Sequence, residues 1–377
     1  MKEIIVFTGG DSNDISTWSN VPFLFTKTLE KKGYIIHRID TSPSKLINRM
    51  FNSLSFYLLR KILKLNACPE FHRTVFHRLI VYRRIKKATK LYKNILFNLF
   101  LEYDFYNKYS DKPNVLWSDW TDRIVIQRFG REPKWYELGS LKHEDNVVKS
   151  ADLVFSLFPK VAKDMSIYYG REFVCLGKNV VNTVCDEKWS LMDIIENRKK
   201  SNKILFVGNT RYFGAAQELI KAYHSLKIKN DSLELHIVGM TKEQLNVKLN
   251  DIFCYGYLNK GVKEERDLYY SLLLSCKVFV NPAKVWGGYS STVEAMYYGS
   301  PIVVAPYDDF VEEFGRDIKF GKYFEDGVSL EGIIESVLVD NNYDSLCVEA
   351  HNLVKDYTWD SYVDSFLFFL KEKGVVD

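Results

Sequence analysis

Residues 281–306 read NPAKVWGGYSSTVEAMYYGSPIVVAP, and this stretch decides the fold. Its pattern predicts a strand, a glycine-rich loop, a helix and a second strand in direct succession. Three hydroxyl residues open the expected helix, and Glu294 lies within its first turn. A glutamate in so apolar a segment needs an explanation, and the sequence allows two.

The first explanation is structural. Ser291 and Glu294 have the S-x-x-E spacing of a capping box, in which the glutamate returns to the backbone N–H of the serine. Gly299 and Pro301 would then end the helix. The second explanation is ligand binding, because a helix N-terminus behind a glycine-rich loop offers unpaired N–H groups to an anion. From the residue pattern alone, the cap is the favoured interpretation.

Short β-branched runs recur elsewhere in the chain. They occupy residues 4–10, 203–209, 233–239, 277–283 and 301–306. Near-continuous apolar runs that alternate with helical periodicity are typical of parallel strands buried on both faces. The runs form two series, so we expect an α/β protein with two Rossmann-like domains whose parallel sheets face a central cleft.

The predicted boundaries follow from these two series. Residues 1–185 would form an N-terminal Rossmann-like domain with a basic helical insertion at about 45–100, and residues 200–355 a C-terminal Rossmann-like domain. Residues 356–377 contain an apolar helix that we expect to pack back on the N-terminal domain. A length of 377 residues suits two domains.

Composition excludes several classes of protein. With 46% hydrophobic and 27% charged residues the chain is globular rather than disordered. Its six cysteines form no C-x-x-C, so neither a zinc site nor a disulfide framework is indicated. The N-terminus shows no signal-peptide pattern, and no uncharged run reaches the ~18 residues of a membrane span. We therefore expect a cytoplasmic location.

Positive charge is concentrated in one segment. Residues 45–93 contain thirteen Lys or Arg and one acid, whereas the whole chain carries only +4. Two helices are expected there, the second beginning at Pro69 with a core-facing stripe that includes Val75 and Leu79. An ordinary solvated face is one interpretation. The other is a peripheral site for the anionic inner face of the membrane, formed by Arg83, Arg84, Lys86 and Lys87. Nucleic-acid binding is disfavoured, because no known module is present.

The stretch VEAMYYGSPIVV resembles the donor-binding signature of family 4 glycosyltransferases, retaining enzymes of the GT-B fold, which reads E-A-M-x-x-G-x-P-[IV]. KILFVGN, LELHIVG, FCYGYL and KDYTW resemble further segments of that donor domain in the family's order. In the first domain, STWSNVPFLFTKTLEKKGY resembles the family's first helix. The resemblance covers most of the chain except residues 42 to about 112.

The resemblance implies that residues 1–185 bind the acceptor and residues 200–355 bind the nucleotide sugar, and it implies roles for particular residues. Glu294 would bind the ribose hydroxyls of a nucleotide sugar, since the two oxygens of a carboxylate can accept both hydroxyls of a diol. Ser290, Ser291 and Thr292 would face the diphosphate, and Tyr257 would lie in the loop that contacts the base. Glycine pairs at two strand or helix ends permit close backbone approach to the donor: Gly9, Gly10, Gly287 and Gly288.

Two departures from the family pattern affect the site. The family commonly has a glutamate where this chain has Trp286, and a lysine where it has Phe213. Arg211 is our candidate for the phosphate, because its fork of donors fits phosphate geometry. Lys284 is a possible substitute for the missing lysine.

The implied reaction is transfer of a sugar to a hydroxyl with retention at the anomeric carbon. The family does not rely on a metal and the chain has no Asp-x-Asp, so we predict no metal and no cofactor beyond the nucleotide sugar. Asp119 follows the strand in NVLWSDWTDR, where the family carries an acidic residue or histidine near the reacting centre. Alternatively, Asp119 or Asp122 caps the following helix.

The leading functional prediction is a glycosyltransferase for cell-surface polysaccharide or glycolipid synthesis, with a glycan or lipid-linked acceptor. The alternative is a catalytically silent relative that binds a nucleotide sugar or a partner protein. The residues at Trp286 and Phe213 motivate this alternative.

Overall fold

The computed structural model describes residues 2–177, 179–185, 189–284 and 289–376. The chain divides into two compact units, each with its own parallel sheet. Unit 1 contains residues 1–178 and 362–377, and unit 2 contains residues 179–361. We expected the first domain to end at residue 185, whereas unit 1 ends at Lys178. The residues that follow belong to unit 2, because Val180 and Val181 are buried and the Val181 N–H donates to the Tyr357 carbonyl within that unit.

The sheet of unit 1 has five parallel strands in the order β2-β1-β3-β4-β5. The strands are β1 (Lys2–Thr8), β2 (Tyr34–Asp40), β3 (Asn98–Phe100), β4 (Asn114–Ser118) and β5 (Leu153–Ser156). The helices are α1 (Val21–Lys31), α2 (Lys45–Ser55), α3 (Val75–Leu91), α4 (Asp122–Arg128), α5 (Leu138–Ser150) and α6 (Pro159–Tyr169), with short turns η1 (Thr17–Asn20) and η3 (Phe71–Arg73) and the π-helical η2 (Phe56–Ile62). The strands β1, β3, β4 and β5 have buried apolar centres, as strands covered on both faces require, whereas the edge strand β2 includes the partly exposed His37 and Arg38.

Helix α15 (Trp359–Glu372) completes the core of unit 1, although unit 2 separates it from the other elements in sequence. Phe366 packs on Phe25 of α1 and on Phe155 of β5, with ring centroids 5.2 and 5.0 Å apart. The indole N–H of Trp117 donates to the Tyr362 hydroxyl at 2.6 Å. A distant segment therefore seals one face of this sheet.

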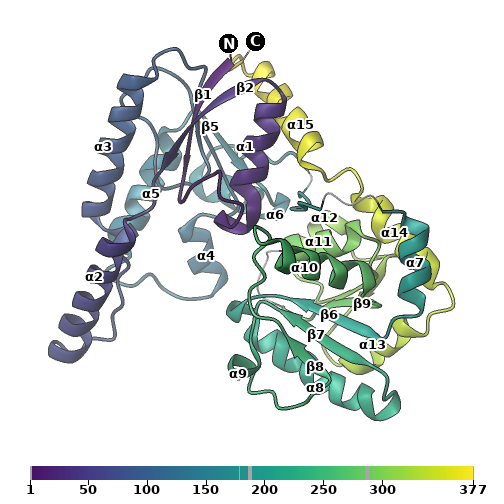
Figure 1. The fold of residues 1–377 in the computed structure, drawn as a ribbon. Helices are drawn as coiled ribbons and strands as arrows, with labels where there is room; N and C mark the ends of the chain where they lie inside the picture. The colour runs from purple at the N-terminus through teal and green to yellow at the C-terminus, as the bar shows by residue number, and fades with distance from the viewer. Residues whose placement is uncertain (1, 178, 186–188, 285–288, 377) are drawn as a thin grey trace. The chain divides into compact units, whose positions relative to one another are not determined.

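The sheet of unit 2 has six parallel strands in the order β11-β10-β9-β6-β7-β8. They are β6 (Lys203–Val207), β7 (Glu234–Val238), β8 (Ile252–Cys254), β9 (Val278–Asn281), β10 (Ile302–Val304) and β11 (Gly321–Tyr323). The helices are α7 (Leu191–Lys199), α8 (Phe213–Lys229), α9 (Lys242–Leu245), α10 (Lys263–Ser275), α11 (Ser290–Tyr297), α12 (Asp308–Phe314), α13 (Leu330–Leu338) and α14 (Tyr343–Val354), with the turn η4 (Thr210–Tyr212). Figure 1 shows helices on both faces of this sheet.

In the basic segment, residues 45–93, the second helix differs from the predicted one in its first residue and in its buried face. Helix α3 begins at Val75, after a Thr74 cap, and not at Pro69. Its buried face consists of His77, Val81, Ile85 and Ala88, whereas Val75 and Leu79 are more than half exposed. The predicted stripe was right for Ile85, which is buried, and wrong for Val75 and Leu79, because it counted apolar residues only. The buried His77 is satisfied by the Thr41 and His72 carbonyls at 2.9 and 3.0 Å.

Candidate functional site

The predicted donor residues of unit 2 lie at the carboxyl ends of its parallel strands. Arg211 follows β6, Tyr257 follows β8, and Lys284 follows β9. Helix α11 begins beyond β9, and the Ser291 hydroxyl lies 3.5 Å from the carbonyl of Val207 at the end of β6. In an open parallel sheet this edge is where ligands bind.

The N-terminus of α11 has no capping box. The helix runs from Ser290 to Tyr297, its N-cap is Tyr289, and no side chain accepts a bond there. Ser290 and Ser291 are partly exposed at this end, whereas Thr292 is buried. The capping interpretation of Glu294 is therefore wrong, since the glutamate side chain turns to another partner.

That partner is Lys260, on the loop between β8 and α10. The ammonium of Lys260 donates to both carboxylate oxygens of Glu294, at 2.8 and 3.0 Å. The side chains are 12% and 4% exposed, so the ion pair is buried. A carbonyl oxygen of Asn182, 3.1 Å away, accepts a further bond from the same ammonium.

Two tyrosines of α10 complete the surroundings of the carboxylate. The Tyr269 hydroxyl donates to Oε2 at 2.8 Å, and the Tyr270 hydroxyl lies 3.4 Å from Oε1. Burial and the adjacent Glu294 raise the pKa of Tyr269 well above its usual value, so the hydroxyl keeps its proton and donates. The Lys260 ammonium also lies 4.4 Å from the centre of the Tyr269 ring, within cation–π range.

Sequence reasoning missed Lys260, Tyr269 and Tyr270. Each is separated from Glu294 by 24 to 34 residues, so no local spacing connects them. One signal could have identified Lys260. The segment FCYGYL resembles a base-contacting loop, and the loop that follows a parallel strand is expected at the carboxyl edge of the sheet. The site thus contains a cation that the family resemblance did not assign.

The remaining donor candidates are more open. Arg211 is exposed on η4, where the Asn209 side chain accepts its backbone N–H at 3.0 Å. Tyr257 is 64% exposed. Lys284 pairs with the exposed Asp326 and lies over the Phe324 ring at 5.2 Å. An ion pair so exposed contributes little, so a ligand phosphate can compete for this lysine. Trp286, Gly287 and Gly288 lie outside the described residues.

In unit 1, Gly9 and Gly10 follow β1. Gly10 has φ +120°, a Cβ there would lie 2.9 Å from Thr17, and its N–H donates to Asp40 at 3.0 Å. Glycine is therefore required at residue 10 by conformation and by space. Gly9 lines a cavity together with Asp119.

Neither aspartate after β4 caps a helix. Thr121 is the N-cap of α4 and accepts from the Ile124 N–H, so the capping interpretation of Asp119 and Asp122 is wrong. Asp119 accepts the Trp120 N–H at 2.8 Å, and Asp122 pairs with Arg73 at 3.0 Å. Within the described part of the chain, no three His, Cys, Asp or Glu side chains are grouped as a metal ion would require.

Comparison with known proteins finds one family model that matches part of the second unit. Residues 187–350 match the model of Glycosyl transferases group 1. No curated protein matches the sequence significantly.

Solved structures of similar fold cover nearly the whole chain. WaaG, a glycosyltransferase involved in lipopolysaccharide biosynthesis, matches with a TM-score of 0.62 at 12% identity over 97% of this chain and 99% of its own. Sucrose-phosphate synthase from Thermosynechococcus elongatus matches with 0.67 at 12% identity over 100% of both chains. A protein assigned as a UDP-N-acetylglucosamine 2-epimerase from Listeria monocytogenes matches with 0.58 at 13% identity over 100% of this chain and 98% of its own.

These likenesses confirm the predicted fold class, an α/β protein of two Rossmann-like domains. The chain has the GT-B fold, and its residues 187–350 match the family model of Glycosyl transferases group 1.

Proposed function

We propose that this protein is a retaining glycosyltransferase that moves a sugar from a nucleotide-sugar donor to a hydroxyl of a glycan or lipid-linked acceptor. The observation that carries the proposal is the buried Glu294 carboxylate on α11, at the ligand-binding edge of a glycosyl transferases group 1 domain. Synthesis of a cell-surface polysaccharide or glycolipid is the setting that such a reaction serves.

The donor ribose binds Glu294 in this proposal. Each oxygen of the carboxylate already accepts from Lys260 and from one tyrosine. Because a carboxylate has about four acceptor positions, the ribose diol must displace the Lys260 ammonium to reach it. The displaced lysine stays near the nucleotide, where its charge suits the diphosphate.

The departing diphosphate gains negative charge as the sugar leaves. Arg211 and the N–H and hydroxyl groups of Ser290, Ser291 and Thr292 stabilise it, so no metal takes part. Asp119 orients the acceptor or stabilises positive charge on the sugar. Tyr257 and Lys284 complete the donor site in unit 2, with Trp286, Gly287 and Gly288 as candidates from the sequence. Gly9 and Gly10 permit close backbone approach of a ligand to the end of β1 in unit 1.

Hydrolysis of the donor without an acceptor tests this function. Incubated with a panel of UDP-, GDP- and CDP-sugars, the protein should slowly release the nucleoside diphosphate and the free sugar from one of them. Release should persist in EDTA, because side chains and backbone donors supply the positive potential. Loss of release in EDTA that Mg²⁺ or Mn²⁺ restores would contradict the metal-free mechanism.

The alternative is a silent nucleotide-sugar-binding or partner-binding protein, which Trp286 and Phe213 favour because they replace two functional groups of the family. Thermal shift separates the two. A ligand at ~100 times its Kd adds about 2.7 kcal/mol of stability. Stabilisation by a nucleotide sugar that is never hydrolysed supports the silent protein.

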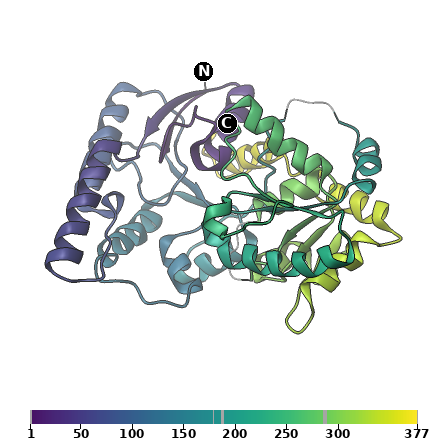
Figure 2. The ribbon, with the colours of Figure 1, turned by 60° about the horizontal axis from the view of Figure 1, so that its bottom comes forward.

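We further propose that the enzyme works at the inner face of the membrane as a peripheral protein, through the segment of α2 and η2, residues 45–62. No residue of either helix is buried. Large apolar side chains there are mostly exposed, including Leu46 at 66% and Met50 at 64%, and the segment carries no acid. In both ribbon views α2 lies at the outer edge of unit 1 (Figure 1 and Figure 2). Within the described residues, no helix is long and apolar enough to span a membrane.

The basic residues of this segment differ in how freely their side chains could reach a lipid surface. Arg84 donates to the Asp40 and Ser42 carbonyls at 2.7 and 2.9 Å, so it holds the β2–α2 connection. Arg83, Lys86 and Lys87 are exposed on α3. Lys45, Arg49 and Lys61, on α2 and η2, stand beside the exposed apolar residues.

Liposome sedimentation tests this surface. The protein should bind vesicles containing phosphatidylserine and not pure phosphatidylcholine. Reversal of Lys45, Arg49 and Lys61 to glutamate should weaken binding roughly 100-fold or more, at ~1 kcal/mol per basic residue. A matched control reverses three exposed lysines of unit 2, Lys221, Lys248 and Lys319. An equal loss in the control, or none in the α2 variant, would rule this surface out.

A further inference from the structure

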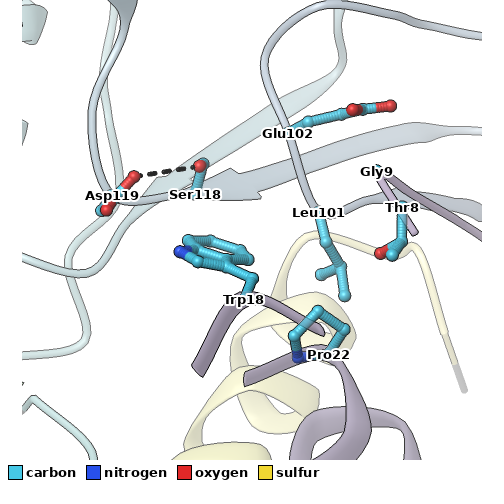
Figure 3. A pocket seen from close by; sticks show the side chains of 8 residues that line it. All are labelled: Thr8, Gly9, Trp18, Pro22, Leu101, Glu102, Ser118 and Asp119. Atoms are coloured by element: carbon cyan, nitrogen blue, oxygen red, sulfur yellow. Dashed lines mark hydrogen bonds between the residues drawn. The ribbon is translucent and has the colours of Figure 1, made fainter. Parts of the chain in front are cut away.

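Unit 1 contains a cavity of about 180 Å³ at the carboxyl ends of β1, β3 and β4. Figure 3 shows Trp18 and Asp119 on one side of it and Thr8, Gly9 and Glu102 on the other. A bound water needs about 10–15 Å³ on this measure. The cavity therefore has room for a group the size of one sugar ring.

One wall is a flat aromatic surface. The half-buried indole of Trp18 packs edge-on against Trp117, with ring centroids 5.7 Å apart. Trp18, Ser19 and Asn20 have φ values of 38°, 52° and 73°, in the left-handed region that such residues rarely adopt. Backbone strain of this kind is retained where the surrounding structure fixes a functional side chain. Here the strained turn places an indole at the cavity.

The opposite wall contains polar groups without partners. Thr8 is 2% exposed, and within the described residues neither its hydroxyl nor Oε1 of Glu102 has a hydrogen-bond partner. Buried polar atoms are nearly always paired, so these two require an explanation. Both residues line the cavity, so a rotation of either side chain would turn its polar atom toward a hydroxyl of a ligand.

The charge of the cavity restricts the ligand. Its lining includes the Glu102 and Asp119 carboxyls and no lysine or arginine among the described residues. Burial and the neighbouring Asp104 raise the pKa of Glu102 to about 8, so at neutral pH this carboxyl both donates and accepts. A phosphate or carboxylate would meet Asp119 without a cation, whereas hydroxyl or ammonium groups find acceptors.

We propose that this cavity binds one ring of the acceptor, a neutral or amino sugar, whose apolar face stacks on Trp18 and whose hydroxyls bond to Thr8, Glu102 and Asp119. The assignment rests on the proposed transferase function. It adds a specificity: the ring that enters the cavity carries no acidic group. Gly9 leaves this space open, because a Cβ there would lie 3.7 Å from Oε2 of Glu102.

Saturation-transfer NMR with methyl glycosides tests the proposal without any donor. Methyl glucoside, methyl galactoside and methyl glucosaminide should be probed with the full chain, and at least one should bind. The matching glucuronide or galacturonide should bind at least tenfold more weakly. Trp18→Ala should weaken binding of the neutral or amino sugar more than tenfold. Trp135→Ala removes an exposed indole elsewhere in unit 1 and should leave binding unchanged.

Two further variants test the sugar cavity independently in case Trp18→Ala folds poorly. Gly9→Val should abolish sugar binding by filling the space beside Glu102. Asp119→Asn should reduce the discrimination against the uronide. Trp18→Ala should still be stabilised by the nucleotide that stabilises the natural protein. Failure of every nucleotide sugar would instead count against the proposed function. Equal binding of the uronide, or unchanged binding in both Trp18→Ala and Gly9→Val, would overturn the sugar cavity.

Discussion

Replacing Lys260 with methionine should lower the free energy of unfolding by about 3–5 kcal/mol. The methionine removes the cation of a buried pair and leaves the Glu294 carboxylate with two tyrosine hydroxyls, in a place that is 4% exposed. Desolvation of a charge without its counter-ion is among the costliest single changes in a core. Equilibrium unfolding in urea, followed by hydrogen exchange of unit 2 amides, measures the loss of unfolding free energy.

A double variant separates charge from packing. Lys260→Met combined with Glu294→Gln removes both charges, so most of the loss should be recovered, with a coupling energy of at least about 1 kcal/mol. Lys263→Met is the matched control, because this nearby lysine is 73% exposed and pairs only with Asp267 within the described residues. Its effect should stay within about 0.5 kcal/mol. Additive losses in the double variant would mean that the pair is not the stabilising unit.

Glu294→Gln should weaken nucleotide binding by about 1.5–3 kcal/mol, roughly 10- to 150-fold, because a charge-assisted bond to the ribose is lost. Donor hydrolysis should fall at least as far. The substitution preserves the side-chain shape, and it removes no helix cap, since α11 has none. Calorimetry with UDP and GDP as probes measures the binding change.

Tyr269→Phe is the control for Glu294→Gln. It deletes the hydroxyl that donates to Oε2 and keeps the carboxylate, so it should cost about 0.5–1.5 kcal/mol of stability while nucleotide affinity changes little. If Glu294→Gln binds both nucleotides normally and only unfolds more easily, Glu294 is a structural partner of Lys260.

The fold could be predicted because its strands are recognisable individually. The runs at 4–10 and 203–209 correspond to β1 and β6, and each is apolar because parallel strands are covered on both faces. Helix α3 was harder. Its buried face includes His77, and burial of a histidine depends on carbonyls of Thr41 and His72 that no periodicity reveals.

The candidate site was only partly predictable for a similar reason. Glu294 was identifiable from its motif, but its actual partner depends on where the β8–α10 loop places Lys260. The capping spacing Ser291–Glu294 was a false signal, because the spacing of two residues in sequence does not determine whether the glutamate turns to the helix end or to a tertiary partner. Trp18 was also missed, because three successive left-handed residues other than glycine have no sequence signature.

The order in which the chain is synthesised gives the packing of α15 a further consequence. Unit 2 is one continuous segment and can fold as soon as it leaves the ribosome, whereas unit 1 lacks α15 until some 180 residues later. At synthesis rates of about 5–20 residues per second, Phe25, Trp117 and Phe155 remain roughly ten seconds or more without the helix that covers them. The nascent first unit is therefore the part of this protein most exposed to aggregation and most dependent on chaperones.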